Sequence, residues 1–302
     1  MNAILPEHHP EAETMSETAT RLIDTHLHQW DLDQCEYAWL DADLPPAFHQ
    51  LRRTFRVDEA REHIEAAGVT EAILVQAENS LADTEAMLAV TAAGNRVTAV
   101  VGWFDLLDPE SAPAALDALQ AAGPVVGIRH LIHDEPDPDW VLRPEVGESL
   151  SVLAEHGMAY DFVGVQLRHL EHVPTLASAV GDLHIVIDHL NKPPIGTDDF
   201  PRWVELMGAV ASFPNVFAKV SGLHNVTPHA DWTPDDLRGA FEVALESFGS
   251  GRLMFGSDWP VCNVGGGYPR QVEAFEALIA PLDAEATEDL QWRSACRAYG
   301  LD

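Results

Sequence analysis

The feature that most constrains this chain is a repeated alternation of short apolar runs with longer segments of helix-forming residues. Eight such runs follow one another, at 23–28, 72–75, 97–104, 125–128, 158–163, 183–187, 216–220 and 253–255. Continuously apolar runs are typical of parallel strands that are covered on both faces. Eight strand–helix units within about 250 residues predict an α/β fold, a single (β/α)8 TIM barrel.

The segments between the runs are predicted to be helical, among them 173–180 and 284–299. An open, doubly wound sheet is the alternative arrangement for such units. It is disfavoured because no Gly-x-Gly-x-x-Gly follows the first run, and the triplet Gly265-Gly266-Gly267 comes after the eighth. Residues 1–20 are acidic and have no apolar core, so we predict a disordered leader there and the barrel over 21–302.

The composition limits the class of partner. The net charge is -32 and only two lysines occur, Lys192 and Lys219. Phosphates would be repelled, so nucleic acids and anionic membranes are excluded as partners and a small-molecule substrate is expected. Three cysteines without Cys-x-x-Cys spacing indicate reduced thiols and a cytoplasmic protein. We expect a monomer or a homodimer. Either a high-salt habitat or an Ala- and Arg-rich genome explains the acidity.

Polar and titratable residues concentrate directly after the apolar runs, where barrel enzymes build their active sites. His26 and His28 end the first run, and alternation along a strand points both side chains the same way. Other runs are followed by further candidates, namely Gln76, Trp103, Arg129, His130, His189, Lys192, His224 and Asp258. Gln76 and Trp103 fit hydroxyl and stacking contacts or barrel packing, and His130 fits a substrate contact or a loop hydrogen bond. Asp188 precedes His189, so we expect it to point outward and to be structural.

Four segments taken in order carry a family resemblance. They are Ile23-Asp24-Thr25-His26-Leu27-His28, Gly127-Ile128-Arg129-His130, Ile187-Asp188-His189-Leu190-Asn191-Lys192-Pro193 and Phe255-Gly256-Ser257-Asp258-Trp259-Pro260. The chain resembles the amidohydrolase superfamily over about residues 22–301, above all its amidohydrolase-related lactonase branch. That branch includes L-fuconolactonase, L-rhamnonolactonase and 2-pyrone-4,6-dicarboxylate lactonase types. The resemblance implies a barrel that hydrolyses a cyclic ester such as a sugar-derived lactone.

The same resemblance assigns roles to individual residues. Asp258 corresponds to the general base that takes a proton from the attacking water. His26, His28 and His189 correspond to groups that bind a divalent metal or polarise the lactone carbonyl directly, and Arg129 to a substrate-binding group. The resemblance places further substrate-binding residues at the rim, namely Lys192, His224 and Trp259.

The sequence departs from the metal-dependent relatives in one respect. The fourth run ends in Arg129, which is a poor ligand because it stays protonated, and the fifth run contains no histidine. A binuclear site is therefore not expected. One zinc or manganese ion held by His26, His28 and Asp258, with or without His189, remains open, and so does metal-free catalysis.

Two other functions fit the same residues. A metal-dependent decarboxylase of an aromatic or muconate-type acid uses the same kind of barrel and the same strand-end ligands. A barrel that binds a sugar acid without converting it would need no carboxylate at the position of Asp258. The loops that would contact the substrate contain no recognisable motif, so the sequence does not indicate which lactone is bound.

Overall fold

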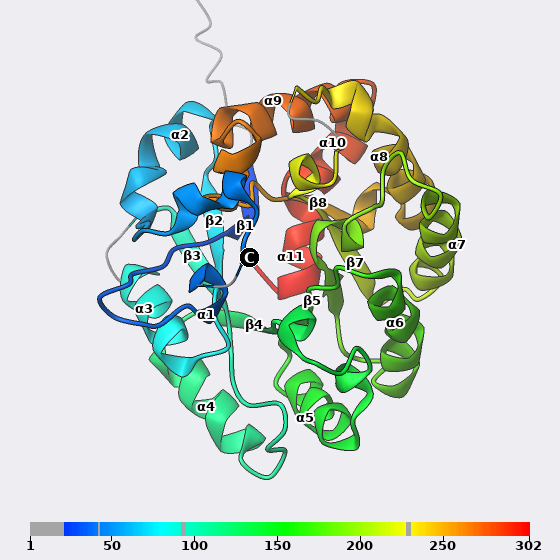
Figure 1. Ribbon diagram of the computed structural model, residues 1–302. Helices are drawn as coiled ribbons and strands as arrows, with labels where there is room; N and C mark the ends of the chain where they lie inside the picture. The colour runs from blue at the N-terminus through cyan, green and yellow to red at the C-terminus, as the bar shows by residue number, and fades with distance from the viewer. Residues whose placement is uncertain (1–20, 42, 92–94, 228–230) are drawn as a thin grey trace, which may run out of the picture.

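Eight parallel strands pair in chain order to form one sheet (Figure 1). The computed structural model describes residues 21–41, 43–91, 95–227 and 231–302, so the predicted leader over 1–20 lies outside the described residues. The strands are β1 (Ile23–Leu27), β2 (Glu71–Val75), β3 (Val97–Gly102), β4 (Val125–His130), β5 (Ala159–Phe162), β6 (Ile185–Ile187), β7 (Val216–Val220) and β8 (Leu253–Phe255). A parallel bridge between Leu27 and Trp259 joins the two ends of the sheet. The predicted (β/α)8 barrel is confirmed.

Helices surround this barrel, except that the last one lies beneath its interior (Figure 1). They are α1 (Ala38–Asp41), α2 (Arg61–Ala66), α3 (Leu81–Thr91), α4 (Ala112–Ala122), α5 (Pro144–Glu155), α6 (Leu167–Ala179), α7 (Phe200–Ala211), α8 (Pro234–Phe248), α9 (Tyr268–Ile279), α10 (Ala284–Glu288) and α11 (Ser294–Tyr299). Helix α8 shows why the boundaries fall where they do. Thr233 and Asp236 form a capping box, Pro234 occupies the first turn and Gly249 follows the last residue.

Two predicted helices have different bounds in the structure. The prediction for 173–180 starts too late, because α6 begins at Leu167 and tolerates Pro174 while it buries Leu170, Val173 and Leu176. The segment 284–299 is not one helix, because a π-helical turn at Asp289–Arg293 separates α10 from α11. In that turn Asp289 accepts hydrogen bonds from Ser250 at 2.7 Å and from Arg297 at 2.8 Å.

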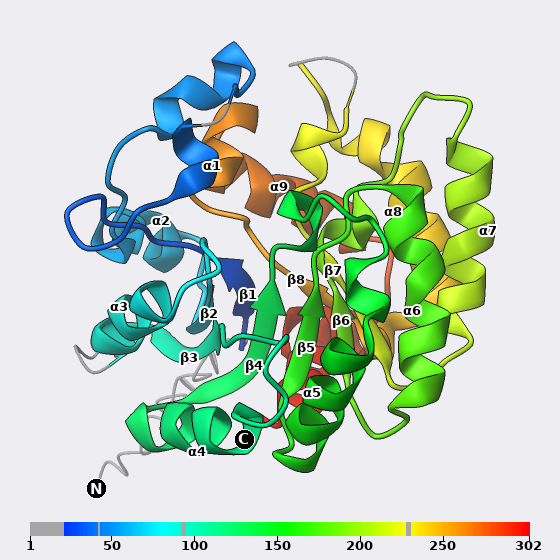
Figure 2. The ribbon, with the colours of Figure 1, turned by 60° about the horizontal axis from the view of Figure 1, so that its bottom comes forward.

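The barrel interior has an apolar layer below and a charged layer above. Alternate strand residues make the apolar layer, and three residues of α11 close it from below. The strand residues are Ile23, Ile73, Val75, Ala99, Val101, Ala159, Val186, Phe217 and Met254, and the helix residues are Ala295, Ala298 and Tyr299. Two residues further along β5 and β7, the same inward face carries Asp161 and Lys219. Figure 2 shows the arrowheads of the strands pointing away from this closed end, toward the end where α1 lies.

None of the helices in the described part of the chain combines the length and the apolarity that a membrane span requires.

Candidate active site

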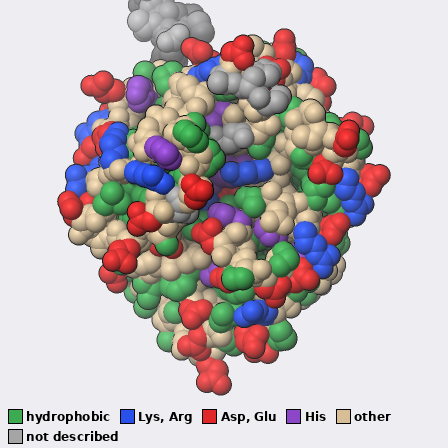
Figure 3. All heavy atoms as spheres, viewed as in Figure 1, with side chains coloured by type: hydrophobic (Ala, Val, Ile, Leu, Met, Phe, Trp, Pro, Cys, Tyr) green, Lys and Arg blue, Asp and Glu red, His purple; other side chains and the backbone are tan. Residues whose placement is uncertain are grey.

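A cavity of 520 Å³ opens among the loops that follow the strands, and its volume suits a small molecule. His28, Arg129, His189, Lys192 and Asp258 line its polar side. Figure 3 shows histidine side chains gathered in the hollow at the middle of this face. The loop over 29–54 contributes Trp30, Trp39, Leu44 and Phe48 to the lining. We call these four residues the loop wall.

The two histidines of the first strand converge on one point. The Nε2 atoms of His26 and His28 are 3.0 Å apart. His28 Nδ1 lies 2.7 Å from the carbonyl oxygen of Val75, which can only accept a hydrogen bond, so a neutral His28 keeps its lone pair on Nε2. That lone pair faces His26 and the Oδ1 atom of Asp258, which is 3.5 Å away.

His189 reaches this point from an unusual backbone turn. Four consecutive residues from His189 to Lys192 have φ values of 54°, 51°, 55° and 49°. Each non-glycine residue in the left-handed region costs roughly 1–2 kcal/mol. Trp203 donates a hydrogen bond to Leu190 O at 2.9 Å and Asn191 donates one to Gln166 O at 3.1 Å, which holds the turn. The turn places His189 against His26, with ring centroids 4.5 Å apart.

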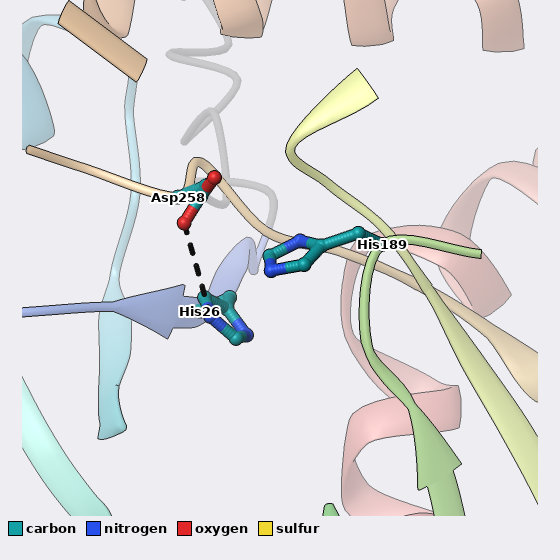
Figure 4. Close-up of side chains that lie close together, drawn as sticks. All are labelled: His26, His189 and Asp258. Carbon is teal, nitrogen blue, oxygen red and sulfur yellow. Dashed lines mark ion pairs between the residues drawn. The ribbon is translucent and has the colours of Figure 1, made fainter. Parts of the chain in front are cut away.

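Asp258 follows β8 and faces the imidazoles of His26 and His189 (Figure 4), and its Oδ1 atom also lies near His28 Nε2. Its Oδ1 atom is 3.9 Å from His26 Nε2, and its φ is also positive, at 59°. Burial alone would raise the pKa of Asp258, but the facing side chains of His189, His28 and His26 hold it below its usual range. Burial lowers the pKa of His189 to about 4 and that of His26 well below its ordinary value. At neutral pH the site therefore combines the ionised carboxylate of Asp258 with the neutral imidazoles of His26 and His189.

Gly222 makes room for this arrangement. It follows β7 with a φ of 59°, and a Cβ atom there would lie 2.6 Å from His189 Nδ1 and 2.9 Å from Asp258 Oδ2. A residue with a side chain would thus be strained in its backbone and would displace both groups.

Beneath the imidazoles lies a set of buried charged residues that we call the interior charged tier, namely Arg129, Asp161, Asp188 and Lys219. Lys219 is fully buried and bonds to Asp161, while its Nζ atom lies 3.1 Å from His26 Nδ1 and 3.1 Å from Asp188 Oδ1. Arg129 donates to Asp188 at 2.9 Å and to the backbone carbonyl of Gln76. Tyr299 of α11 donates to Asp161 at 2.9 Å.

The outward orientation expected for Asp188 is wrong. Asp188 is fully buried and contacts Arg129, His26 and Lys219. Val186 faces the barrel interior, and Asp188 lies two residues later on the same side. His189 also reaches the site because the left-handed turn breaks the alternation after Ile187.

The remaining sequence candidates fall into two groups. Lys192 and Arg129 line the cavity together with His28, His189 and Asp258. Five others do not lie among the cavity-lining residues and have neighbours of their own, namely Gln76, Trp103, His130, His224 and Trp259. Trp103 donates to His130 Nδ1 at 3.1 Å, and His130 stacks on Trp140 with centroids 4.1 Å apart.

The other three of those five are equally engaged. Gln76 donates to Arg129 O at 3.1 Å, His224 pairs with Gln271 at 3.2 Å, and Trp259 packs edge-on against Phe55. These residues stand one layer behind the cavity surface.

Sequence reasoning missed Asp161 and Lys219 altogether. The available signal was a single charged residue inside an otherwise apolar strand, Asp161 within β5 and Lys219 within β7. A buried charge needs an opposite charge close by, so an acid on β5 and a lysine on β7, both inside one barrel, are expected to meet across β6.

The donor set fits one divalent cation. Ligand atoms of His26, His189 and Asp258 all lie within 4.8 Å of one another, and all three residues are buried. His28 adds a lone pair on Nε2, and its bond to the Val75 carbonyl is the kind of outer contact that orients metal-binding histidines. Imidazole and carboxylate groups suit zinc or manganese.

Comparisons with known proteins agree with this geometry. A family model described as amidohydrolase matches residues 23–301. The L-fucono-1,5-lactonase of Burkholderia ambifaria is 33% identical over 247 residues, which cover 81% of this chain and 82% of that protein. The L-fucono-1,5-lactonase of Burkholderia multivorans is 29% identical over 92% of this chain and 96% of that protein.

A solved amidohydrolase from Burkholderia multivorans, with bound zinc, superposes with a TM-score of 0.81. It is 29% identical to this chain, and the match covers 93% of this chain and 99% of that one.

Proposed function

The chain belongs to the amidohydrolase family, and from that premise we propose that it hydrolyses a sugar-derived lactone, an aldonolactone such as L-fucono- or L-rhamnonolactone. The observation that carries the proposal is the ionised Asp258 held against His26, His28 and His189 at the base of a small-molecule cavity. The lactonases among its relatives support the same bond type.

Asp258 serves as the general base. Opening a cyclic ester requires water to lose a proton as it attacks the carbonyl carbon, and a positioned carboxylate accelerates such a step by about 10²–10⁴-fold. The carboxylate of Asp258 takes that proton, and the ring oxygen leaves as a hydroxyl group after receiving a proton. The product is a hydroxy acid whose carboxyl group is ionised at neutral pH, so each turnover releases one proton.

The imidazole N–H groups of His26 and His189 stabilise the charge that develops on the carbonyl oxygen, whereas the Nε2 lone pair of His28 suits a metal ligand. A well-aimed donor at such an oxygen contributes about 3–4 kcal/mol to lowering the barrier. Lys219 and Arg129, beneath His26, add positive charge on the same side. A zinc or manganese ion held by His26, His28, His189 and Asp258 would act there as a Lewis acid.

The first test is a pH-indicator assay against a panel of sugar γ- and δ-lactones plus 2-pyrone-4,6-dicarboxylate. We expect acidification with one stereochemical family, and a loss of at least about 10²-fold in kcat/KM for Asp258→Asn. Asp182→Asn, which removes a charge at a site outside the cavity lining, is the matched control.

Two outcomes would redirect the assignment. No acidification across the panel, with zinc and manganese supplied and at low and high salt, would remove the lactonase proposal in favour of the decarboxylase, which carbon dioxide release from aromatic acids would detect. Full activity after exhaustive chelation, verified by metal analysis, would remove the metal from the reaction while leaving Asp258 as its base.

A further inference from the structure

The cavity has a second polar wall, which carries negative charge and would repel an acidic substrate. Glu78 belongs to the loop after β2 and Asp134 to the loop after β4, and both line the same cavity as Asp258. Burial raises the pKa of Glu78, and the charge of Asp134 raises it further. Because both residues line one cavity, a ligand there meets both carboxylates.

These two carboxylates are not neutralised by arginine or lysine among the described residues. Glu78 accepts hydrogen bonds from the backbone N–H groups of Ala38 at 2.8 Å and of Asn79 at 3.1 Å. Within the described part of the chain, the only ion pair of Asp134 is with His133, whose Nε2 atom lies 3.7 Å from Asp134 Oδ1. Each carboxylate oxygen has two acceptor positions, so both groups can accept further hydrogen bonds from a ligand.

The cations that line the cavity are outnumbered by its carboxylates. Arg129 is paired with Asp188 at 2.9 Å and bonds to the Gln76 carbonyl, and Lys192 shares the cavity lining with Asp258, whose charge offsets its own. Glu78 and Asp134 are then left as a surplus of negative charge, in a chain whose net charge is -32.

We propose that Glu78 and Asp134 determine specificity by selecting uncharged, hydroxyl-rich lactones and rejecting lactones that carry a carboxylate. Hydroxyl groups donate to the free acceptor positions of the two carboxylates, whereas a substrate carboxylate meets two like charges in a partly desolvated cavity. This inference rests on the proposed lactonase function and adds the residues that choose among lactones.

The same charges act on the product. Ring opening consumes one water and turns a neutral ester into a carboxylate and a proton. The neutral substrate can approach Glu78 and Asp134, but the anionic product is repelled by them, so the reaction itself weakens binding.

The test uses two lactones that differ in one group. D-galactono-1,4-lactone is neutral, and D-galactaro-1,4-lactone carries a carboxylate in place of its terminal hydroxymethyl group. Each like charge at about 6–8 Å is expected to lower kcat/KM for the anion about tenfold, so the wild type should prefer the neutral lactone by about 10²-fold. Glu78→Gln with Asp134→Asn should reduce that preference at least about tenfold, and Glu285→Gln on α10 should not change it.

The outcomes are separable. Equal kcat/KM for both lactones in the wild type, or an equal loss for both in the variants, would overturn the specificity role and leave Glu78 as an anchor for α1 through Ala38. If neither lactone is hydrolysed, calorimetry with galactonate and galactarate measures the same preference without turnover. Tighter binding of galactarate there would overturn the inference independently of the catalytic proposal.

Discussion

The interior charged tier lies beneath the imidazoles and the loop wall lines the cavity above them, and the two regions are built in different ways. The tier consists of strand and strand-end residues whose charged groups satisfy one another, with Lys219 and Asp188 fully buried. The loop wall consists of aromatic and aliphatic side chains from the loop over 29–54, of which Trp30 is buried and Trp39, Leu44 and Phe48 are half-buried. The difference teaches that substitutions in the tier should change both the reaction and the stability of the barrel, whereas substitutions in the loop wall should change substrate binding alone.

The largest effect that separates the two regions is expected from Lys219→Met. The substitution leaves Asp161 and Asp188 buried without their ammonium partner, which should lower the free energy of unfolding by about 3–5 kcal/mol. Chemical denaturation measures the change. Arg202→Met removes exposed pairs with Glu171 and Glu205, and is expected to cost less than about 1 kcal/mol. Similar losses for the two variants would show that the tier is not special.

Gly222→Ala tests the geometry of the site next. The new Cβ would lie 2.6 Å from His189 Nδ1, so we expect kcat/KM to fall about 10²-fold through misplacement of the catalytic groups. Gly68→Ala is the matched control, because it has the same left-handed backbone at φ 69° but nothing within 4 Å of a Cβ. If both variants lose activity equally, backbone strain rather than displacement of His189 and Asp258 is the cause.

The free energy of unfolding at acidic pH should also depend on the buried His189. Because the folded pKa of His189 is lowered from 6.5 to about 4, the unfolded chain binds a proton in this window that the folded chain does not. Unfolding free energy should therefore fall as pH decreases from about 6.5 to about 4, by at most about 1.4 kcal/mol per pH unit for this group. Denaturation with chelator present should give a smaller slope for His189→Gln and an unchanged one for His49→Gln.

The smallest effect is expected in the loop wall. Phe48→Leu trims a half-buried ring that lines the cavity, so KM should rise about threefold to tenfold while kcat stays near the wild-type value. The free energy of unfolding should change by less than about 1 kcal/mol. Phe213→Leu, a half-buried phenylalanine outside the cavity lining, should leave KM unchanged. A large fall in kcat for Phe48→Leu would mean that the loop wall takes part in the chemistry.

The parts of the fold that depend on sequence pattern were predictable. The apolar runs indicate eight strands, and the polar residues after them indicate the end of the barrel that holds His26, His28, His189 and Asp258. The orientation of Asp188 was not predictable, because Ile185, Val186 and Ile187 are all apolar and show no alternation. The left-handed turn after Ile187 contains no glycine, so nothing in the residue types indicates it.

The bond from Tyr299 to Asp161 has a consequence for how the protein is made. A nascent chain folds from its N-terminus, and all eight strands leave the ribosome before Tyr299 does. Until α11 docks, Asp161 lacks one of its donors and the apolar layer remains open from below. The charges around Lys219 therefore gain their Tyr299 donor only when the segment at the end of the chain has docked.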